Sequence, residues 1–528
     1  MRRLAVGNRG RARSLRLLGI GLVGLLLACE GDGSGGEGLI IRNDPDPGCA
    51  PAGRDFPSGL AVLSPEVSRA ALVQTRPPDV RVYGLDADAP TLLSVVNIGL
   101  DSDGDGIPDT EAIEPILGPF RSPVMGEIQA VSDEIALVST SDYEQVLVVD
   151  PRTGRPVEVT IEVPSGIPPG RHPLLPAPGT SATRTGLSTL ACVSPPDPVD
   201  SEGDPIGVEP ACSADAPSFL TTLTAGKAVV GGRLFVATSN LIPRTSRYAP
   251  GTVLVFDWEE GPNGIVVRPS VDTPMLWTSV FNPTGLVAFR TPGGRELALV
   301  TGTGAIGFGS GASNIRTESA IDVIDPSVPR IVASIPLGLA GPSFDAPAVE
   351  PGGRLAFLGA SSQRRIYAID LRALDTPALH ARSGPPVVLD GMTLGFEDAR
   401  VFTADRPLEL PRRGDGRASG ACEGNTDVTT NALGTQAFVT DFCDGTLTRL
   451  RFDLEGSPPV PYAPERFSIA GQSSPFAPND DFGQLSAPGL VLARPGIPGV
   501  DFTSPDLLVL AGQPNAQLCA FRIESDRD

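Results

Sequence analysis

Short apolar stretches separated by turn residues run along almost the whole chain after residue 30. In the clearest example, 354–370, a short apolar stretch follows the turn Pro351–Gly353, and an alternating stretch, Ile366–Ile369, then ends on Asp370. Alternation of apolar and polar residues between turn residues is the pattern of half-buried β-strands. Stretches with helical periodicity are nearly absent from the same region. The pattern therefore predicts an all-β protein.

The strand ending of that example, apolar-x-apolar-x-acid, recurs along the chain. It closes at Asp86, Asp150, Asp257, Asp325, Asp370, Asp453 and Glu524, which makes about seven repeats at spacings of roughly 45 to 107 residues. The first repeat offers four strand candidates, which is the content of one propeller blade. The repeats predict a seven-bladed β-propeller of four-stranded antiparallel blades over residues 49–528.

Individual strands are predicted best in the first two repeats. The candidates are Leu60–Leu63, Ala71–Gln74, Val80–Leu85 and Leu92–Ile98, then Ile128–Val131, Ile135–Ser139, Gln145–Asp150 and Val157–Val163. Later repeats fall near 217–274, 277–338, 346–389, 396–471 and 474–525. Segments 164–216 and 406–430 do not follow the repeat pattern. They are rich in Pro, Gly and Ser, and we interpret them as loop insertions.

The first 28 residues are a leader, with a basic start and an apolar core, Leu17–Leu27, too short for a transmembrane helix of about 20 residues. Its end, Leu26-Leu27-Ala28-Cys29, resembles a bacterial lipobox. The resemblance implies cleavage of signal peptide 1–28 and acylation of Cys29, with palmitate among the lipids. Glu30 is not the Asp that retains some lipoproteins in the inner membrane. We therefore expect an outer-membrane lipoprotein that faces the periplasm or the exterior; an ordinary secretory leader is the alternative.

The segment after the acylated cysteine, 29–48, has the composition of a flexible tether, with a short strand candidate at Leu39–Ile41. Because the last repeat ends at its third strand, Leu518–Ile523, this N-terminal strand is predicted to complete the last sheet and remove its open edge.

Charge narrows the range of partners. The formal net charge is −21, and the leader carries six arginines and no acid, so the mature chain is more acidic still. The negative electrostatic potential of such a chain disfavours binding to nucleic acid and to anionic lipid surfaces, and it favours binding to cations or basic ligands. The simpler explanation is that acidic charge keeps an exported protein soluble. We expect a monomer that meets the membrane through its lipid and a protein or glycan partner through its loops.

The most specific local motif lies between the first two repeats. Its acids and glycine match the first nine positions of an EF-hand-type calcium loop, and it also resembles the calcium loops of thrombospondin type 3 repeats. Position 12 is Ala112, where a bidentate Glu is expected, and a solvated acidic turn is the alternative. The motif predicts a structural calcium held by Asp101, Asp103, Asp105, the carbonyl of Ile107, and Asp109.

Seven cysteines leave six after lipidation of Cys29, an even number for an oxidising compartment. Closure of the propeller by the N-terminal segment brings the first of the six close to the last. The predicted disulfides are Cys49–Cys519, with Cys192–Cys212 and Cys422–Cys443 as local loops.

Groups suited to acid–base or nucleophilic catalysis are scarce. The chain has two histidines, His172 and His380, which we interpret as surface residues, and one lysine, Lys227. No nucleophile motif is present. We therefore predict no catalytic residues.

The repeats PTGLVAF (283–289), PGGRLAF (351–357) and ALGTQAFV (432–439) resemble the YVTN/lactonase-like β-propeller families. The resemblance implies a propeller fold and, in the lactonase-like members, a metal held by Glu, Asn and Asp side chains around the channel mouth. The positions to inspect are Asn282, Glu350 and Asn431. The sequence thus predicts a lipid-anchored binding or scaffolding module; the alternative is a metal-dependent hydrolase.

Overall fold

The structure is a computed structural model that describes parts of residues 49–523. It leaves out 52–56, 65, 75–78, 86–89, 99–124, 141–144, 168–175, 190–191, 194–198, 201–218, 221–222, 243–246, 249, 306–316, 340–345, 360–364, 390–407, 410–424, 432–433, 442–445, 454–459, 462–464, 469–487, 495–505 and 513–516. The chain divides into two compact units, 1–38 and 39–528, and every described residue belongs to the second.

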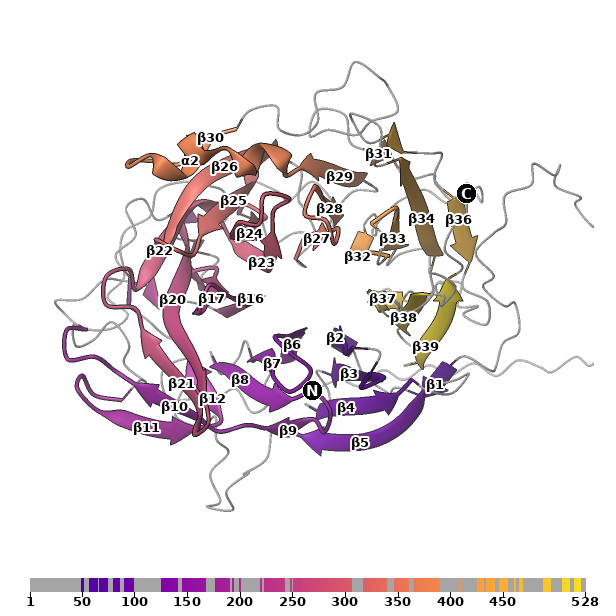
Figure 1. Cartoon of the computed structure of the whole chain (residues 1–528), viewed down its shortest axis with the longest axis horizontal. Coiled ribbons are helices and arrows are strands. Elements are labelled where there is room, and N and C mark those ends of the chain that lie inside the picture. The colour runs from indigo at the N-terminus through magenta and orange to yellow at the C-terminus, as the bar shows by residue number, and fades with distance from the viewer. Residues whose placement is uncertain are drawn as a thin grey trace, which may run out of the picture. The chain divides into compact units, whose positions relative to one another are not determined.

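The second unit is built from mainly antiparallel sheets whose innermost strands face a common centre (Figure 1). Each sheet is named here by that innermost strand. The β2 sheet contains β2 (Pro57–Val62), β3 (Arg69–Gln74), β4 (Asp79–Gly84) and β5 (Thr91–Asn97). The β6 sheet contains β6 (Met125–Ala130), β7 (Ala136–Thr140) and β8 (Gln145–Asp150), with β9 (Arg155–Pro156) and β12 (Gly186–Ser188) both paired to β8.

The β16 sheet contains β16 (Leu223–Val230), β17 (Arg233–Thr238) and the long strand β20 (Pro250–Gly261), which pairs with both β21 (Gly264–Pro269) and β22 (Met275–Phe281). It is extended by β10 (Val159–Glu162) and β11 (Ser181–Arg184). The β23 sheet contains β23 (Pro283–Arg290), β24 (Glu296–Gly302), β25 (Ser319–Asp325), β26 (Arg330–Gly338) and β30 (Val387–Val388).

The remaining large sheets come from the C-terminal part of the chain. The β27 sheet contains β27 (Ala348–Val349), β28 (Leu355–Gly359), β29 (Arg365–Asp370) and β31 (Leu408–Glu409). The β32 sheet contains β32 (Asn425–Thr430), β33 (Gln436–Asp441), β34 (Thr446–Asp453), β35 (Val460–Pro461) and β36 (Glu465–Ser468). The β37 sheet contains β37 (Pro488–Arg494), β38 (Asp506–Gly512), β39 (Gln517–Ile523) and β1 (Cys49–Pro51).

Short elements complete the described chain. They are the pair β13 (Cys192–Val193) and β15 (Phe219–Leu220), the three strands β14 (Val199–Asp200), β18 (Leu241–Ile242) and β19 (Arg247–Tyr248), the 3₁₀ helix η2 (Arg372–Asp375) and the helix α2 (Pro377–Ala381). Among the described residues, no helix has the length and apolar character needed to cross a membrane.

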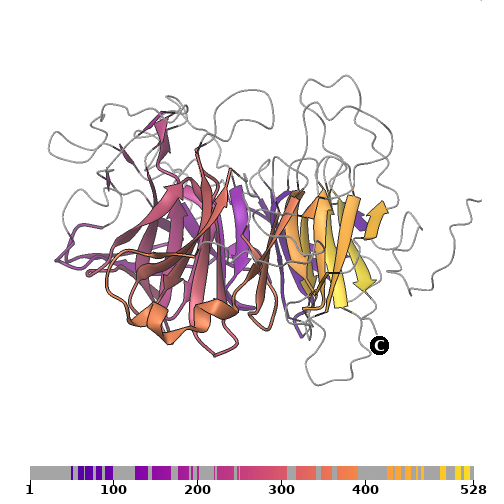
Figure 2. The same cartoon turned by 90° about the horizontal axis from the view of Figure 1, so that it is seen from above.

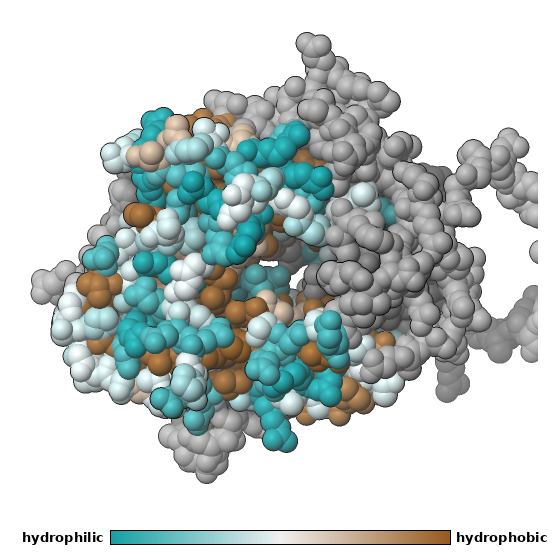
Figure 3. All heavy atoms as spheres, viewed as in Figure 1, coloured by the Kyte–Doolittle hydropathy of each residue, from teal (hydrophilic) through white to brown (hydrophobic). Residues whose placement is uncertain are grey.

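Neighbouring innermost strands contact one another around the centre, where the space-filling view shows an opening (Figure 3). Strand β2 contacts β6 and β37, β16 contacts β6 and β23, and β32 contacts β27 and β37. In the view turned by 90°, the strands run along the axis of this ring (Figure 2). The all-β propeller fold predicted from the repeats is therefore confirmed.

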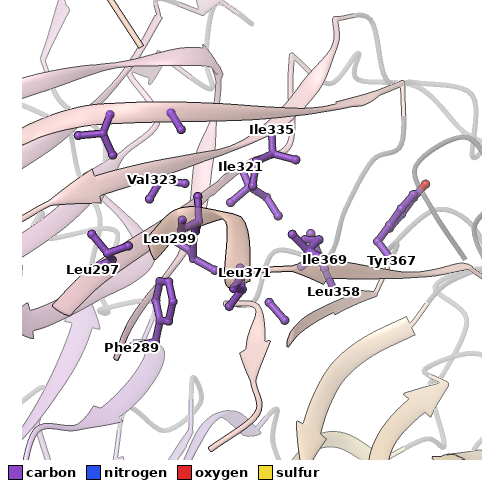
Figure 4. Packing of buried hydrophobic residues seen from close by; sticks show 14 of the residues in the cluster. Phe289, Leu297, Leu299, Ile321, Val323, Ile335, Leu358, Tyr367, Ile369 and Leu371 are labelled. Atoms are coloured by element: carbon purple, nitrogen blue, oxygen red, sulfur yellow. The ribbon is translucent and has the colours of Figure 1, made fainter. Parts of the chain in front are cut away.

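Apolar side chains fill the spaces between adjacent sheets. One cluster joins the β23 and β27 sheets, where Leu299 and Ile321 of one sheet are buried with Leu358 and Ile369 of the next (Figure 4). Similar clusters lie between the β2 and β6 sheets, the β6 and β16 sheets, and the β16 and β23 sheets. Alternate residues of each strand thus pack against opposite neighbours, which explains the near-continuous apolar strands.

The recurring acid at the strand ends has a local structural cause. The Oδ1 atoms of Asp150, Asp325 and Asp370 each accept a hydrogen bond from the backbone N–H two residues ahead, at 2.9, 3.0 and 3.0 Å. These are Asx turns, in which the side chain satisfies the backbone as it leaves the sheet. The acid therefore ends the third strand of its sheet.

Two features of the second repeat differ from the prediction. Strand β10, expected as the last strand of the β6 sheet, instead pairs in parallel with β21 of the next sheet, with Val159 opposite Ile265. Its place beside β8 is taken by β12, in antiparallel register. The described part of segment 164–216 is therefore more than a loop insertion: it contributes β11 to the β16 sheet, β12 to the β6 sheet, and β13 and β14 to two small sheets. A strand's hydrogen-bonding edge accepts any partner of suitable register.

The N-terminal part of the chain completes the last sheet. Strand β1 pairs with β39 in antiparallel register, with Cys49 opposite Cys519. A strand from the N-terminal end of the described chain thus forms the outer edge of the last sheet. The strand that pairs is Cys49–Pro51, whereas the candidate at Leu39–Ile41 lies outside the described residues.

Candidate functional site

The innermost strands other than β27 share an irregularity close to their starts. Their pairing with the second strand shifts register at a β-bulge, which adds a residue and re-aims the side chains beside it. The shifts lie between Pro57 and Gly59, Met125 and Ile128, Leu223 and Lys227, Pro283 and Gly285, Asn425 and Val428, and Pro488 and Leu490. The Pro-x-Gly motif at 283–285 therefore belongs to the innermost strand, not to the turn before the second strand.

Glycine allows neighbouring bulges to approach closely. A Cβ on Gly59 would lie 2.4 Å from Ile128 N, and a Cβ on Gly226 would lie 2.7 Å from Thr284 O. Both contacts are too short for any side chain. The starts of adjacent innermost strands therefore lie together at one end of the ring, which we call the N-terminal rim.

The turns that follow the innermost strands lie together at the opposite end, the C-terminal rim. Ser64 N, after β2, donates to Asp133 Oδ1, after β6, at 2.9 Å. A Cβ on Gly353 would strike the carbonyl oxygen of Arg290 in the preceding sheet. The two rims thus lie at opposite ends of the ring, and side chains at one rim do not form a site with side chains at the other.

A buried amine and a carboxyl group meet at the N-terminal rim. Lys227 of β16 is completely buried, and its Nζ donates a hydrogen bond to the backbone oxygen of Glu127 in β6 at 2.7 Å. Glu127 is partly exposed as a residue, but its Oε2 atom is buried and has no hydrogen-bond partner among the described residues. An unsatisfied buried carboxyl oxygen is costly and needs an explanation.

Burial changes the acid–base character of both groups. It lowers the pKa of Lys227 from 10.5 to about 8, although the Glu127 charge opposes the shift. Burial raises the pKa of Glu127 above its usual value, with Lys227 opposing. The two pKa values therefore move toward each other, and the amine exists partly as a neutral group near neutral pH. Perturbed pairs of this kind are concentrated at functional sites.

The three positions inspected for a metal do not form one site. Asn282 precedes β23 and lies at the N-terminal rim, whereas Glu350 and Asn431 follow β27 and β32 and lie at the C-terminal rim. Asn282 has a left-handed backbone (φ 54°), and its Nδ2 donates to Thr303 Oγ1 at 2.7 Å. Its role is to shape the entry into β23.

Glu350 and Asn431 close the turns that they begin. The Glu350 carboxylate accepts bonds from Gly352 N at 2.7 Å and from Arg354 Nε at 3.0 Å, and its side chain is fully buried. Asn431 Oδ1 accepts from Gln436 N at 2.9 Å. These side-chain oxygens accept hydrogen bonds within their own hairpin turns, so both side chains have a structural role in those turns.

His380 differs from the prediction of a surface histidine on an outer strand. It lies in α2 with a side chain that is 5% exposed. Its Nδ1 is 2.9 Å from Asp325 Oδ2 and its Nε2 is 2.8 Å from Leu374 O. Both ring nitrogens thus face oxygen atoms of the β23 sheet and of η2, and these contacts fix α2 to the β23 sheet.

Several predicted site residues lie outside the described residues: Cys29, the loop 101–109, His172, Cys212, Cys422 and Cys443. Cys192 lies in β13, which pairs with β15. Within the described ranges, no group of three or more His, Cys, Asp or Glu residues is arranged to hold a metal ion. The Glu127–Lys227 pair was not predicted; the available signal was the single lysine.

No protein-family model and no curated protein matches the sequence. Solved structures similar to the chain include hydrazine synthase of Kuenenia stuttgartiensis, with a TM-score of 0.44 and 11% identity over 89% of this chain and 96% of that chain. The Cps50 (Swd1) β-propeller domain of Myceliophteria thermophila gives a TM-score of 0.42 and 10% identity over 90% and 99% of the two chains. The Dos1 propeller gives 0.42 and 9% identity over 91% and 95%.

Proposed function

We propose that this chain is a lipid-anchored, seven-bladed β-propeller of the cell envelope that binds a small polar ligand at its N-terminal rim. The observation that carries the binding proposal is the buried Glu127 Oε2, which has no hydrogen-bond partner among the described residues, on the residue whose backbone oxygen accepts from the buried Lys227 amine. Ligand sites combine apolar walls with a few placed polar groups, and the next residue after each member of the pair, Ile128 and Ala228, is buried and apolar.

Seven blades are supported by the succession of innermost strands. In order, β2, β6, β16, β23, β27, β32 and β37 each begin a sheet, and contacts between neighbours return from β37 to β2. The pairing of β1 with β39 gives the last sheet its outer strand from the other end of the described chain.

Envelope anchoring is supported by the leader, whose Leu26-Leu27-Ala28-Cys29 ending resembles a lipobox. The test is Cys29→Ser. We expect this variant to lose fatty-acid incorporation and to leave the membrane fraction, and unchanged membrane retention would contradict the anchor.

Binding is tested by a thermal-shift screen of small polar metabolites against the wild type, Glu127→Gln and Glu66→Gln. The last variant removes an exposed acid from the β2–β3 turn at the C-terminal rim. We expect a ligand that raises the melting temperature of the wild type and of Glu66→Gln but not of Glu127→Gln. A ligand that stabilises all three proteins equally would place the site elsewhere, and a panel without any stabilising ligand would contradict small-ligand binding.

The rival function, metal-dependent hydrolysis, is tested on the same proteins with lactone and ester panels in Ca²⁺, Mn²⁺ or Zn²⁺. Turnover that is lost on replacement of one rim acid would overturn the binding proposal.

A further inference from the structure

Lys227, the single lysine of the chain, is buried, and burial is the condition under which the acid–base behaviour of lysine differs most from that of arginine. All the other basic residues are arginine, in a total of 41 Lys and Arg. An arginine side chain stays protonated in proteins, whereas a buried lysine can lose its proton and then carries a nucleophilic lone pair. The one position in this chain that holds lysine is also completely buried.

The surroundings of Lys227 supply what a neutral amine needs in order to react. Its Nζ is held 2.7 Å from the Glu127 carbonyl oxygen, and the Glu127 carboxyl group belongs to the same bulge. The raised pKa of Glu127 lets this group exist as an acid as well as a base. An amine with a lowered pKa beside such a carboxyl group is the arrangement of covalent catalysis through lysine.

We propose that the Lys227 amine forms a reversible imine with a small aldehyde or ketone, and that the Glu127 carboxyl group carries the protons. This rests on the ligand site proposed above and names its ligand class. The amine nitrogen bonds to the carbonyl carbon as the C=O π bond opens. The carbonyl oxygen takes a proton from the Glu127 carboxyl group, and the nitrogen returns one to the resulting carboxylate, which gives a neutral carbinolamine. Glu127 then donates a proton to the departing hydroxyl and recovers one from nitrogen. Water leaves, a C=N bond forms, and no oxidant or reductant is consumed.

The carbonyl compound must be small because the Lys227 amine is shielded from solvent. Lys227 has no exposed surface, whereas Glu127 is partly exposed, so a ligand reaches the amine past the Glu127 side chain. The bulges of β6 and β16 are the parts of these strands with the least regular pairing, and a local opening there disrupts few ladder hydrogen bonds.

The test is reductive trapping with acetaldehyde or pyruvate and cyanoborohydride near pH 8, followed by peptide mapping. Because Lys227 is the only lysine, an adduct on a lysine identifies it without ambiguity. The same reaction is run on the folded protein and on the protein unfolded in urea. We expect trapping in the folded protein to be roughly tenfold faster than in urea, since a positioned acid accelerates such steps by at least that factor. Slower trapping in the folded protein would identify a protected structural amine and overturn the proposal.

Two variants separate the role of Glu127 from general effects of stability. Glu127→Gln should slow trapping in the folded protein and leave the rate in urea unchanged. Asp322→Asn changes another buried carboxyl group, in β25 of the β23 sheet, which accepts hydrogen bonds from Ser279 in β22. This variant should leave both rates unchanged. Equal folded-state rates in Glu127→Gln and the wild type would remove Glu127 from the reaction.

This outcome is distinguishable from failure of the binding site itself. If Lys227 is protected while a ligand without a carbonyl group still stabilises the protein through Glu127, the imine fails and the binding site stands.

Discussion

Cys49 lies directly opposite Cys519 in the antiparallel pairing of β1 with β39. The two residues are separated by almost the whole described chain, yet their backbones are neighbours in one sheet. Directly opposed residues of an antiparallel pair have Cα atoms about 4.5–5.5 Å apart, which is within the range that a disulfide spans. The register therefore places the two ends of the propeller where one covalent bond would join them.

We predict that this bond forms in the exported protein. Peptide mapping without reduction should recover Cys49 linked to Cys519, and Cys49→Ser should lower the free energy of unfolding in urea by about 2–5 kcal/mol. Cys192→Ser, which affects a local loop pair, should have a smaller effect because the loop that it closes is shorter. Recovery of Cys49 linked to another cysteine would contradict this closure.

The close approach of β2 and β6 predicts that Gly59→Ala destabilises the protein. The new Cβ would lie 2.4 Å from Ile128 N, so backbone must move, at a cost of about 1–3 kcal/mol. Gly84→Ala is the matched control, since its nearest neighbour would be a Leu93 side-chain carbon at 3.5 Å, an ordinary contact. Urea unfolding of the two variants measures the difference, and equal stabilities would be inconsistent with the tight rim.

The lowered pKa of Lys227 predicts a pH dependence of stability. Between pH 8 and 10.5 the unfolded chain holds a proton that the folded protein has released, so stability should rise with pH across this window. Lys227→Met lacks the group and should lack this rise. The measurement is the free energy of unfolding of both proteins at several pH values. If the free energy of unfolding changed with pH by the same amount in both proteins, Lys227 would have an ordinary pKa.

The contact between His380 and Asp325 predicts an acid-sensitive contribution to stability. Burial alone would raise the pKa of Asp325, but hydrogen bonds from Ser327 and His380 lower it below its usual value. A carboxyl group with a lowered pKa stabilises the fold above its unfolded pKa, and this stabilisation disappears as pH falls through the folded value.

His380→Phe should therefore cost about 1–3 kcal/mol at neutral pH, because it removes a hydrogen-bond partner from the buried Asp325 carboxylate. The deficit relative to the wild type should shrink as Asp325 becomes protonated. Urea unfolding at neutral and acidic pH measures it, and a deficit that does not change with pH would show that His380 acts through packing alone.

Calcium binding at 101–109 stays a prediction from the motif, and it has a direct test. A chelator should lower the melting temperature of the wild type but not of an Asp103→Ala/Asp105→Ala double variant. An identical response of both proteins would place the metal elsewhere or exclude it.

Elements that depend only on neighbours along the chain could be predicted from the sequence. Strands β2 to β5 fall where alternation and turns predict them, and the acids at Asp150, Asp325 and Asp370 recur because each closes the turn that follows it. The fold class follows as well, since every repeat carries the same local signals.

Only the tertiary structure decided which distant residues meet. Glu127 and Lys227 are 100 residues apart and no spacing rule links them; they meet because the bulges of β6 and β16 lie at one rim. The same reason separates Asn282 from Glu350, which precede similar Pro-x-Gly motifs but lie at opposite ends of the innermost strands. Strand β10 pairs with β21 because the free edge of β21 lies next to it in the assembled fold. Which strand edge lies nearby depends on how the sheets assemble, and the sequence of β10 alone does not determine it.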